Sequence, residues 1–421
     1  MLRPDEICVA FHWAGISRGR RRDWTKEDVL QWSLRGGIHM TDKYLVEPDV
    51  NFIKEIVGLG GDTLKKCFQC ATCSVACPIS PDTKPFPRKE MIAASWGLKD
   101  RLVGNPDIWL CHNCGDCTAK CPRGAKPGDV LGAVRAYAIT EYAVPKALGK
   151  AVKDPKKLPF LLAVPVVIFL AVGLILKIFG INWLNFSPHG GEIWQDHFIS
   201  NFLVDCIMVP TFFGAVVVFA LGLKRFLADI HANALADGKT EKEKIDPSGF
   251  IKALIRIIPT ILKHKKFNDC TENSERTTPH MMVLLSFIGL FVVTTCFFLA
   301  EWVFQIDGPY SQLNPIKWIA NVSGIALIIG GVLLITNRTS KKDQVSTYWD
   351  WYLVGLVLLL GLTGLLTETA RLGGIAWLTY FIYAIHLILV WCLFAYTPFS
   401  KLAHFVYRTV AMAYNEYSGR Q

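Results

Sequence analysis

Two cysteine runs with the same spacing constrain the fold of this chain more than any other feature. They are Cys67-x2-Cys70-x2-Cys73-x3-Cys77-Pro78 and Cys111-x2-Cys114-x2-Cys117-x3-Cys121-Pro122. Three thiolates at this spacing can bind three irons of one [4Fe–4S] cluster, while the fourth, followed by proline, is directed toward a second cluster. The spacing therefore predicts two clusters with crossed ligand sets. One set is Cys67, Cys70, Cys73 and Cys121, and the other is Cys111, Cys114, Cys117 and Cys77.

Other uses of these cysteines fit less well. Structural zinc prefers two well-separated Cys-x2-Cys pairs that close one tetrahedron, and disulfides are disfavoured by the spacing and by the cytoplasmic placement predicted below. Residues 88–96 and 107–110, which lie between the runs, have helical character. This long helical spacer resembles the α-helical ferredoxin domain of succinate dehydrogenase iron–sulfur subunits and of the heterodisulfide reductase C subunit, rather than a compact β-rich ferredoxin.

The second half of the chain is strongly apolar. The whole chain is 52% hydrophobic and 19% charged, which excludes a disordered chain and disfavours an ordinary soluble enzyme. A helix needs about 20 apolar residues to cross a bilayer, and six stretches are long enough. These expected spans are residues 158–179, 199–224, 279–303, 317–336, 347–368 and 376–398.

Basic residues in the connecting loops predict the orientation of these spans. Loops 225–278 and 337–346 are rich in Lys and Arg, whereas loops 180–198 and 304–316 contain neither, and loop 369–375 contains one, Arg371. We therefore expect a multi-pass protein of the cytoplasmic (inner) membrane, with both termini and the cysteine runs in the cytoplasm. The net charge of +10 needs no nucleic-acid partner, because the basic residues lie where anionic lipid and cytoplasmic partners would be.

Histidines in or near the apolar stretches are candidate cofactor ligands, because imidazole is costly in lipid without a partner. His386 and His404 are 18 residues apart, so one continuous helix would carry both on one face, about 27 Å apart. A bis-histidine b haem needs a second imidazole from a facing helix. We pair His404 with His280 at the cytoplasmic side, and consider His197 for His386.

The other histidines are weaker candidates. His189 lies in the same outer loop as His197 and is placed less well. His231 is an alternative cytoplasmic ligand, although we expect both His231 and His264 to be surface residues. The alternative for His386 and His404 is that they only form hydrogen bonds with neighbouring helices.

The 18-residue histidine spacing resembles the cytochrome b subunit of respiratory nitrate reductase and the E subunit of heterodisulfide reductase. In those families the last span supplies one ligand to each of two haems, and both partner histidines lie ten residues apart on one earlier span. Here the first partner falls on His280, whereas the second position is Leu290. The resemblance therefore implies one or two b haems in a six-span bundle of cytochrome b type, and a mostly α-helical chain.

The order of these features over residues 40–410 resembles the C subunit of the quinone-interacting membrane-bound oxidoreductase complex of sulfate-reducing prokaryotes. The resemblance implies electron transfer between menaquinol and adenylylsulfate reductase, with the flavin and iron–sulfur A and B subunits as further partners. A heterodisulfide-reductase-like or other respiratory complex is the alternative. The chain has no Gly-x-Gly-x-x-Gly motif near residues 58–63, so we expect no flavin or substrate site of its own.

A quinone site needs an apolar cleft and groups that exchange protons. The outer-side candidates are Asp205, Glu301, Glu368 and Arg371. Glu368 and Arg371 are also spaced for a plain ion pair, and Glu301 beside Trp302 is equally suited to an interfacial anchor. A quinone site at the cytoplasmic side, near the His280 and His404 pair, is the alternative.

The expected domain boundaries follow from these patterns. Residues 1–39 form an N-terminal extension, with Met40 as an alternative start of translation. Residues 40–157 form the ferredoxin domain, 158–408 the membrane domain and 409–421 a C-terminal tail. Residues 250–264 have apolar and basic residues at helical spacing, which is typical of a helix on a membrane surface or against a partner.

Overall fold

The computed structural model describes residues 48–82, 85–186, 192–238, 240–264, 269–306, 308–340 and 345–419. The expected extension 1–39 and His189 lie outside these residues. Residues Pro48–Gln421 form one compact unit, and every regular element in its described part is a helix. The prediction of a mostly α-helical chain is confirmed.

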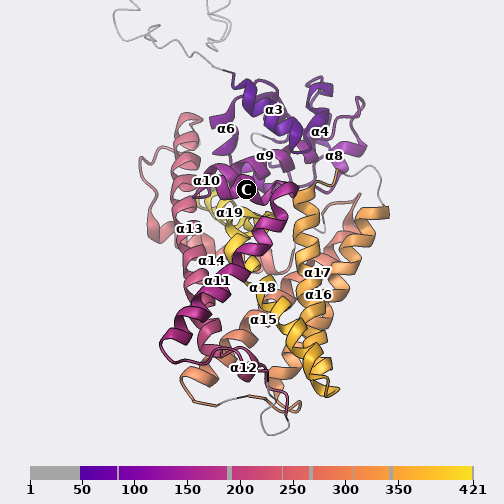
Figure 1. The fold of residues 1–421 in the computed structure, drawn as a ribbon. Coiled ribbons are helices and arrows are strands. Elements are labelled where there is room, and N and C mark those ends of the chain that lie inside the picture. The colour runs from indigo at the N-terminus through magenta and orange to yellow at the C-terminus, as the bar shows by residue number, and fades with distance from the viewer. Residues whose placement is uncertain are drawn as a thin grey trace, which may run out of the picture. The chain divides into compact units, whose positions relative to one another are not determined.

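The front part, which carries both cysteine runs, is a group of short helices around one longer helix, α9 (Figure 1). Its elements are α3 (Val50–Gly58), η1 (Asp62–Lys66), α4 (Thr72–Val75), α5 (Arg88–Ser95), α6 (Lys99–Val103), α7 (Asp107–Leu110), α8 (Asp116–Ala119) and α9 (Pro127–Tyr142). The short helices α4 and α8 each start just after a residue with positive φ, Ala71 at 68° and Gly115 at 98°. These matching turns place the third cysteine of each run inside a helix.

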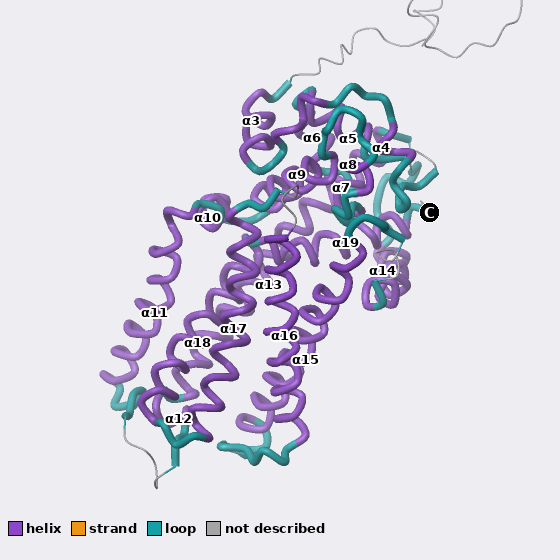
Figure 2. Tube along the Cα trace, turned by 90° about the vertical axis from the view of Figure 1, so that its right-hand side faces the viewer, coloured by secondary structure: helices purple, strands orange, loops and turns teal. Residues whose placement is uncertain are grey.

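The rest of the unit is a bundle of long apolar helices, with the front part at one end (Figures 1 and 2). Within the described residues, six helices are long and apolar enough to cross a membrane, so the prediction of six spans is confirmed. They are α11 (Leu158–Ile178), α13 (Asn201–Ala236), α15 (Thr277–Trp302), α16 (Pro315–Ser340), α17 (Tyr348–Leu372) and α18 (Ala376–Tyr396). Their outer faces expose many large apolar side chains, as lipid-facing helices do.

Several span ends differ from the expected ones, and α13 differs most. α13 continues to Ala236 rather than ending at residue 224, because its last turns bury Phe226, Ile230 and Ala234 in the core that the front part shares with the bundle. The last span does not run through to His404. α18 ends at Tyr396 and two 3-10 turns follow, η5 (Thr397–Phe399) and η6 (Lys401–Ala403).

The continuous helix predicted for His386 and His404 is therefore wrong. Pro398 cannot donate an amide hydrogen bond, and Ser400 is extended, with φ −99° and ψ 174°. A new helix, α19 (His404–Tyr417), starts at His404 and packs on α14 (Pro247–Leu262) and α7. The argument that placed both histidines on one helix face, about 27 Å apart, does not hold.

The smaller connecting helices complete the chain. They are α10 (Lys146–Val152), η2 (Pro155–Lys157), α12 (Gln195–Phe198) and η4 (Ser274–Arg276). The helix expected within 250–264 is present as α14, whose first turn is capped by the Asp246 carboxylate; this accepts from the Ser248 and Gly249 amides.

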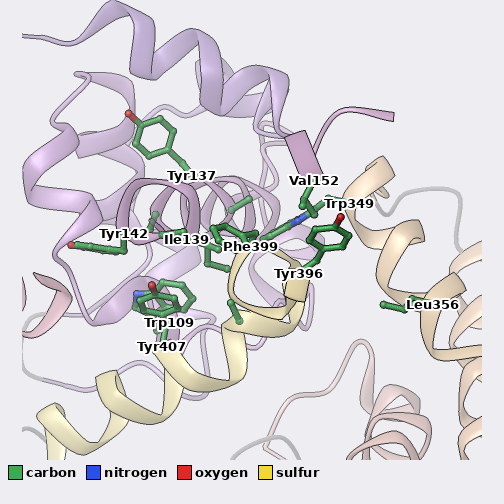
Figure 3. Close-up of a cluster of buried hydrophobic side chains, with 14 of the residues drawn as sticks. Trp109, Tyr137, Ile139, Tyr142, Val152, Trp349, Leu356, Tyr396, Phe399 and Tyr407 are labelled. Atoms are coloured by element: carbon green, nitrogen blue, oxygen red, sulfur yellow. The ribbon is translucent and has the colours of Figure 1, made fainter. Parts of the chain in front are cut away.

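An aromatic cluster joins the front part to the bundle. Trp109 of α7 stacks on Tyr407 of α19 with ring centroids 5.3 Å apart, and Phe226 of α13 packs edge-on against both rings. Tyr142 at the end of α9 lies in the same cluster (Figure 3). Burying a large aromatic side chain contributes about 1.5–3 kcal/mol, so this cluster fixes the front part against the helix ends.

Candidate metal centres

The first cysteine run lies close to the surface of the front part. Cys70 is exposed, and the neighbouring Phe68 and Val75 are 66% and 87% exposed. Arg88 of α5 donates from Nε to the Gln69 carbonyl over 2.9 Å. Cys73 is buried at 8% exposure, so the first run is held by local contacts with Cys70 at its exposed edge.

The second run is covered by guanidinium groups from three separate elements. Arg135 of α9 and Arg408 of α19 donate to the Cys111 carbonyl over 3.0 and 3.2 Å. Arg276, just before α15, donates to the Asn113 carbonyl over 3.1 Å. Cys114 and Cys117 are both 7% exposed, so this run is enclosed.

The loop that leads into α15 also binds the second run. Asp116 accepts from the Thr271 hydroxyl over 3.0 Å and from the Glu272 amide over 2.8 Å. Cys270, only 2% exposed, lies in this loop, and its thiol and the ligand atoms of Cys114 and Asp116 all lie within 4.8 Å of one another. Sequence reasoning missed Cys270, because a lone cysteine in a long polar loop carries no spacing signal.

The second run has the donor chemistry for an iron–sulfur cluster. Burial, followed by the charges of Cys111 and Cys114, raises the pKa of the Cys77 thiol to about 12. Burial also raises the pKa of Cys117, and Cys111, Cys114 and Cys77 are its charged neighbours. Buried thiols this close together favour a bound cation that converts them to thiolates, as iron does.

The thiols that surround Cys77 and Cys73 are relevant to the predicted crossed ligand sets. Cys77 belongs to the first run by sequence but interacts with the thiols of the second run, as the crossed set requires. In the first run, Cys73 interacts with Cys67 and Cys70. Cys121 is assigned to the first cluster by the motif alone, so the crossed sets stay a prediction.

A cavity of about 1280 Å³ runs through the helix bundle. One end is lined by Cys111 and His112 of the second run, and residues near the far end include Lys317 and Glu368. Most of its lining is apolar, with side chains from α13, α15, α16, α17 and α18. Four further histidines line it, namely His264, His280, His386 and His404.

The structure brings the predicted pair His280 and His404 together. Their ring centroids lie 6.4 Å apart. Two metal–imidazole bonds of about 2 Å, each with a further 1 Å or so to the ring centre, need roughly 6 Å. The centroid separation is compatible with one metal ion bound by both rings, and the cavity around them supplies the apolar surroundings that a haem needs.

Hydrogen bonds leave the same nitrogen of both rings for a metal. His404 Nδ1–H donates to the Lys401 carbonyl over 2.6 Å. His264 Nδ1–H donates to the Ile261 carbonyl, so its Nε2 accepts from His280 Nδ1–H over 2.8 Å. A neutral imidazole that donates from Nδ1 presents Nε2 as the ligand. Burial, followed by the charge of His280, lowers the pKa of His404 to about 3, so its ring is neutral and able to coordinate.

His386 has a different environment. Its Nδ1 is 2.8 Å from the Thr363 hydroxyl, and its ring lies over Gly364, where an added Cβ would approach Cε1 to 3.2 Å. Leu290 lines the cavity. His197 is not among the described residues that line the cavity, and packs edge-on against Trp194.

The expected surface position of His231 is wrong, and His264 is half-buried rather than fully exposed. His264 lies in the cavity against His280, because the end of α14 folds back over the bundle. His231 is 8% exposed, and its Nδ1 is 2.9 Å from the Tyr414 hydroxyl. It therefore packs between α13 and α19, outside the cavity lining.

Of the four residues predicted for quinone binding and proton exchange, Glu368 and Arg371 form an ion pair, whereas Glu301 and Asp205 accept hydrogen bonds. Glu368 binds both Lys317 and Arg371 at 2.9 Å, so the ion pair offered as the alternative is present. Glu301 accepts from the Asn201 amide over 2.9 Å, and Asp205 accepts from the Trp302 indole over 2.6 Å. Asp205 and Glu368 line the cavity, whereas Glu301 and Arg371 are not among its described lining residues.

Comparisons with known proteins divide the chain in the same way. Residues 63–125 match the 4Fe-4S dicluster domain. The C subunit of the H(2):CoB-CoM heterodisulfide,ferredoxin reductase of Methanothermobacter marburgensis is 39% identical over 87 residues, which cover 21% of this chain and 47% of that protein. A protein of Archaeoglobus profundus that is named for its likeness to the heterodisulfide reductase C subunit is 32% identical over 107 residues, 25% of this chain and 57% of that protein. The chain thus spans about half the length of these curated relatives.

A third relative covers both halves. The citrate utilization protein B of Escherichia coli is 26% identical over 402 residues, 88% of this chain and 92% of that protein. No solved structure matches the chain. The chain therefore carries a [4Fe–4S] dicluster domain related to the heterodisulfide reductase C subunit, followed by a helical bundle that suits a multi-pass membrane protein.

Proposed function

We propose that this chain is a membrane electron-transfer subunit that relays electrons between menaquinol and a cytoplasmic oxidoreductase. One b haem, held by His280 and His404, and the two [4Fe–4S] clusters form the relay. The observation that carries this proposal is that the two histidines and the cluster ligand Cys111 line one cavity. In the proposed orientation, the front part and both termini lie on the cytoplasmic face of the inner membrane.

The surroundings of the histidines support one haem rather than two. The rings of His280 and His404 lie edge-on with their centroids 6.4 Å apart, a separation that suits one metal. For His386, the described lining of the cavity has Leu290 at the family's second ligand position. We therefore propose that His386 is not a haem ligand. It forms a hydrogen bond with Thr363 and adds a polar group to the cavity wall.

The remaining cavity is suited to a quinone. Quinol oxidation releases two electrons and two protons, so the site needs an apolar cleft and a proton acceptor. Glu368 forms ion pairs with Lys317 and Arg371. These two cations favour the ionised carboxylate, so Glu368 is poorly suited to accept a proton. Asp205 lines the same cavity and accepts one hydrogen bond from Trp302, so we propose Asp205 as the proton acceptor.

The partners are proposed from relatives of the front part. Its likeness to the C subunits of heterodisulfide reductases supports a complex with flavin and iron–sulfur A and B subunits. Adenylylsulfate reductase is the proposed final electron partner, through the resemblance to the quinone-interacting oxidoreductase complex. The alternative is another respiratory complex. The match to citrate utilization protein B across 88% of the chain shows that a protein named for a different process resembles both halves of this chain. Co-purification with adenylylsulfate reductase would support the first assignment, and its absence from the purified complex would support the second.

Haem and iron quantification tests the relay. We expect the detergent-purified chain to contain one b haem, by pyridine haemochrome assay, and about eight non-haem irons. His280→Ala and His404→Ala should each lose the haem and keep the iron. His231→Ala is the matched control, since His231 is a buried histidine outside the cavity lining. A colourless protein would refute the proposal, and two haems would mean that His386 has found a second ligand.

A further inference from the structure

Two guanidinium groups converge on one cluster ligand at the cytoplasmic end of the cavity. Arg408 lies one helical turn after His404 on α19, and donates to the Leu110 and Cys111 carbonyls, both over 3.2 Å. Arg135, from the middle of α9, donates to the Ile108 and Cys111 carbonyls over 2.7 and 3.0 Å. Both side chains line the cavity.

These two cations have no carboxylate partner in the part of the chain that the structure describes. Three other basic residues along the cavity have one, since Arg338 and Lys401 pair with Asp350 and Lys317 pairs with Glu368. A guanidinium is charged at every physiological pH, and placing two of them together away from bulk water is unfavourable without an anion. The position of Arg135 and Arg408 therefore calls for a negative charge nearby.

The second cluster is such an anion. Its four thiolate ligands outweigh the charge of the iron–sulfur core, and each reduction adds one negative charge. When bound, a [4Fe–4S] cluster takes up and releases one electron, with no bond formed or broken and no proton exchanged. Nearby positive charge stabilises the reduced state more than the oxidised state.

We propose that Arg408 and Arg135 are positioning residues that compensate the charge of the second cluster and raise its reduction potential. Arg408 also links the second cluster to the site of His280 and His404. It donates to the Cys111 carbonyl and lies one turn of α19 after His404. His112 extends this contact, with Nε2 2.9 Å from Arg408 Nη2. This inference rests on the proposed function, since it assumes that both centres are loaded.

A reductive titration followed by electron paramagnetic resonance tests the proposal. The full chain is purified in detergent and reduced stepwise with dithionite, and the two cluster signals are assigned with Cys73→Ser and Cys117→Ser. In Arg408→Gln we expect the reduction equilibrium of the second cluster to shift about tenfold toward the oxidised form, with the first cluster unchanged. Arg408→Lys, which keeps the charge, should restore most of the wild-type equilibrium.

Two matched variants control for indirect effects. Arg88→Gln removes a guanidinium that donates to the backbone of the first run, and should move the signal of the first cluster alone. Arg225→Gln removes a guanidinium that donates to the Tyr142 carbonyl, also where the front part meets the bundle, and should move neither signal. Arg135→Gln should shift the second cluster in the same direction as Arg408→Gln, so it replaces that variant if the latter loses the cluster.

The outcomes separate the two proposals. Absence of iron from the wild-type chain would refute the proposed function itself. Two loaded clusters with an unchanged equilibrium in both Arg408→Gln and Arg135→Gln would overturn only the role of these arginines. An equal shift in the reduction equilibria of both clusters in Arg408→Gln would also overturn it, because the effect would then not be specific to the second cluster.

Discussion

The two cysteine runs have the same spacing and the same turn geometry but different surroundings. Among the described residues, the backbone of the first run accepts from one guanidinium, that of Arg88, and its thiol Cys70 is exposed. The second run accepts from three arginines and buries Cys114 and Cys117. The motif therefore specifies the metal ligands, whereas the rest of the chain specifies the environment of each cluster.

The difference comes from the membrane half of the chain. Arg276 precedes α15 and Arg408 follows α18, so the spans deliver both side chains to the second run. The first run receives no such contact from a spanning helix in the described part of the structure. The second run thus lies toward the histidines, while Cys70 of the first run lies at the surface. This arrangement suits the proposed order of cavity, second cluster, first cluster and electron partner.

The largest expected effect is the loss of a whole cluster, which tests from which run each cluster takes its ligands. Cys77→Ser should remove the second cluster, because the charged neighbours of Cys77 are Cys111 and Cys114 and serine is a poor substitute for a thiolate. Iron should fall from about eight to about four atoms per chain. The remaining resonance signal should match that of Cys117→Ser. A match with Cys73→Ser instead would mean that each run binds its own cluster.

Exposure should make the first cluster more reactive. Phe68 and Val75 are largely exposed beside Cys70, whereas the second run is enclosed. We expect ferricyanide to destroy the first cluster about tenfold faster than the second. The decay of the two resonance signals over time measures this ratio. Equal rates would show that the enclosure of the second run opens readily.

Removing the loop contact should weaken the enclosure of the second run. Asp116→Asn replaces a carboxylate that accepts from Thr271 and Glu272, which should cost about 1–3 kcal/mol. We expect a lower melting temperature and faster loss of the second cluster to ferricyanide. Asp82→Asn, an exposed position near the first run, is the control and should change neither. An unaltered Asp116→Asn protein would mean that the arginines alone enclose the run.

The smallest effect concerns the helical spacer between the runs. Glu90 is 1% exposed, and burial, followed by the charge of Asp107, raises its pKa from 4.5 to about 8. Because the folded pKa is the higher one, the stability that Glu90 contributes is complete below pH 4.5 and is lost as pH rises through 8.

Glu90→Gln should remove this pH dependence. We expect the variant to be similar to wild type near pH 4.5 and more stable than wild type by at least about 1 kcal/mol at pH 9, because the loss accumulates between these two values. Melting curves across pH in detergent provide the measurement. Parallel pH profiles for the two proteins would show that Glu90 is ionised at neutral pH through its contact with Lys89.

Much of the fold could be read from local patterns. The cysteine spacing indicates the two cluster motifs, and the apolar stretches indicate the six spans that the structure contains. The pairing of His280 with His404 also followed from their depth, although the helix assumed to carry His404 is interrupted at Pro398 and Ser400. That interruption had a signal, since proline and serine together disfavour a continuous helix.

Other parts of the site had no local signal. Cys270, His264, Arg135 and Arg408 lie far from the cysteine motifs in sequence, or on helices with no pattern that marks them. Cys270, His264 and Arg408 acquire their places only when the loop before α15, the end of α14 and the start of α19 fold against distant segments. Arg135 of α9 reaches Cys111 across 24 residues of sequence. Contacts between distant segments depend on packing, which spacing in the sequence does not encode.

The sequence by itself determined the chemistry that short-range geometry controls, namely thiol ligands at fixed spacing and helices long and apolar enough for a bilayer. Only the tertiary structure decided which run is enclosed, which nitrogen of each histidine is left for a metal, and where unpaired positive charge gathers. The physical reason is that ligand spacing and hydrophobic length are properties of neighbouring residues. Burial and electrostatic environment are sums over side chains that only folding brings together.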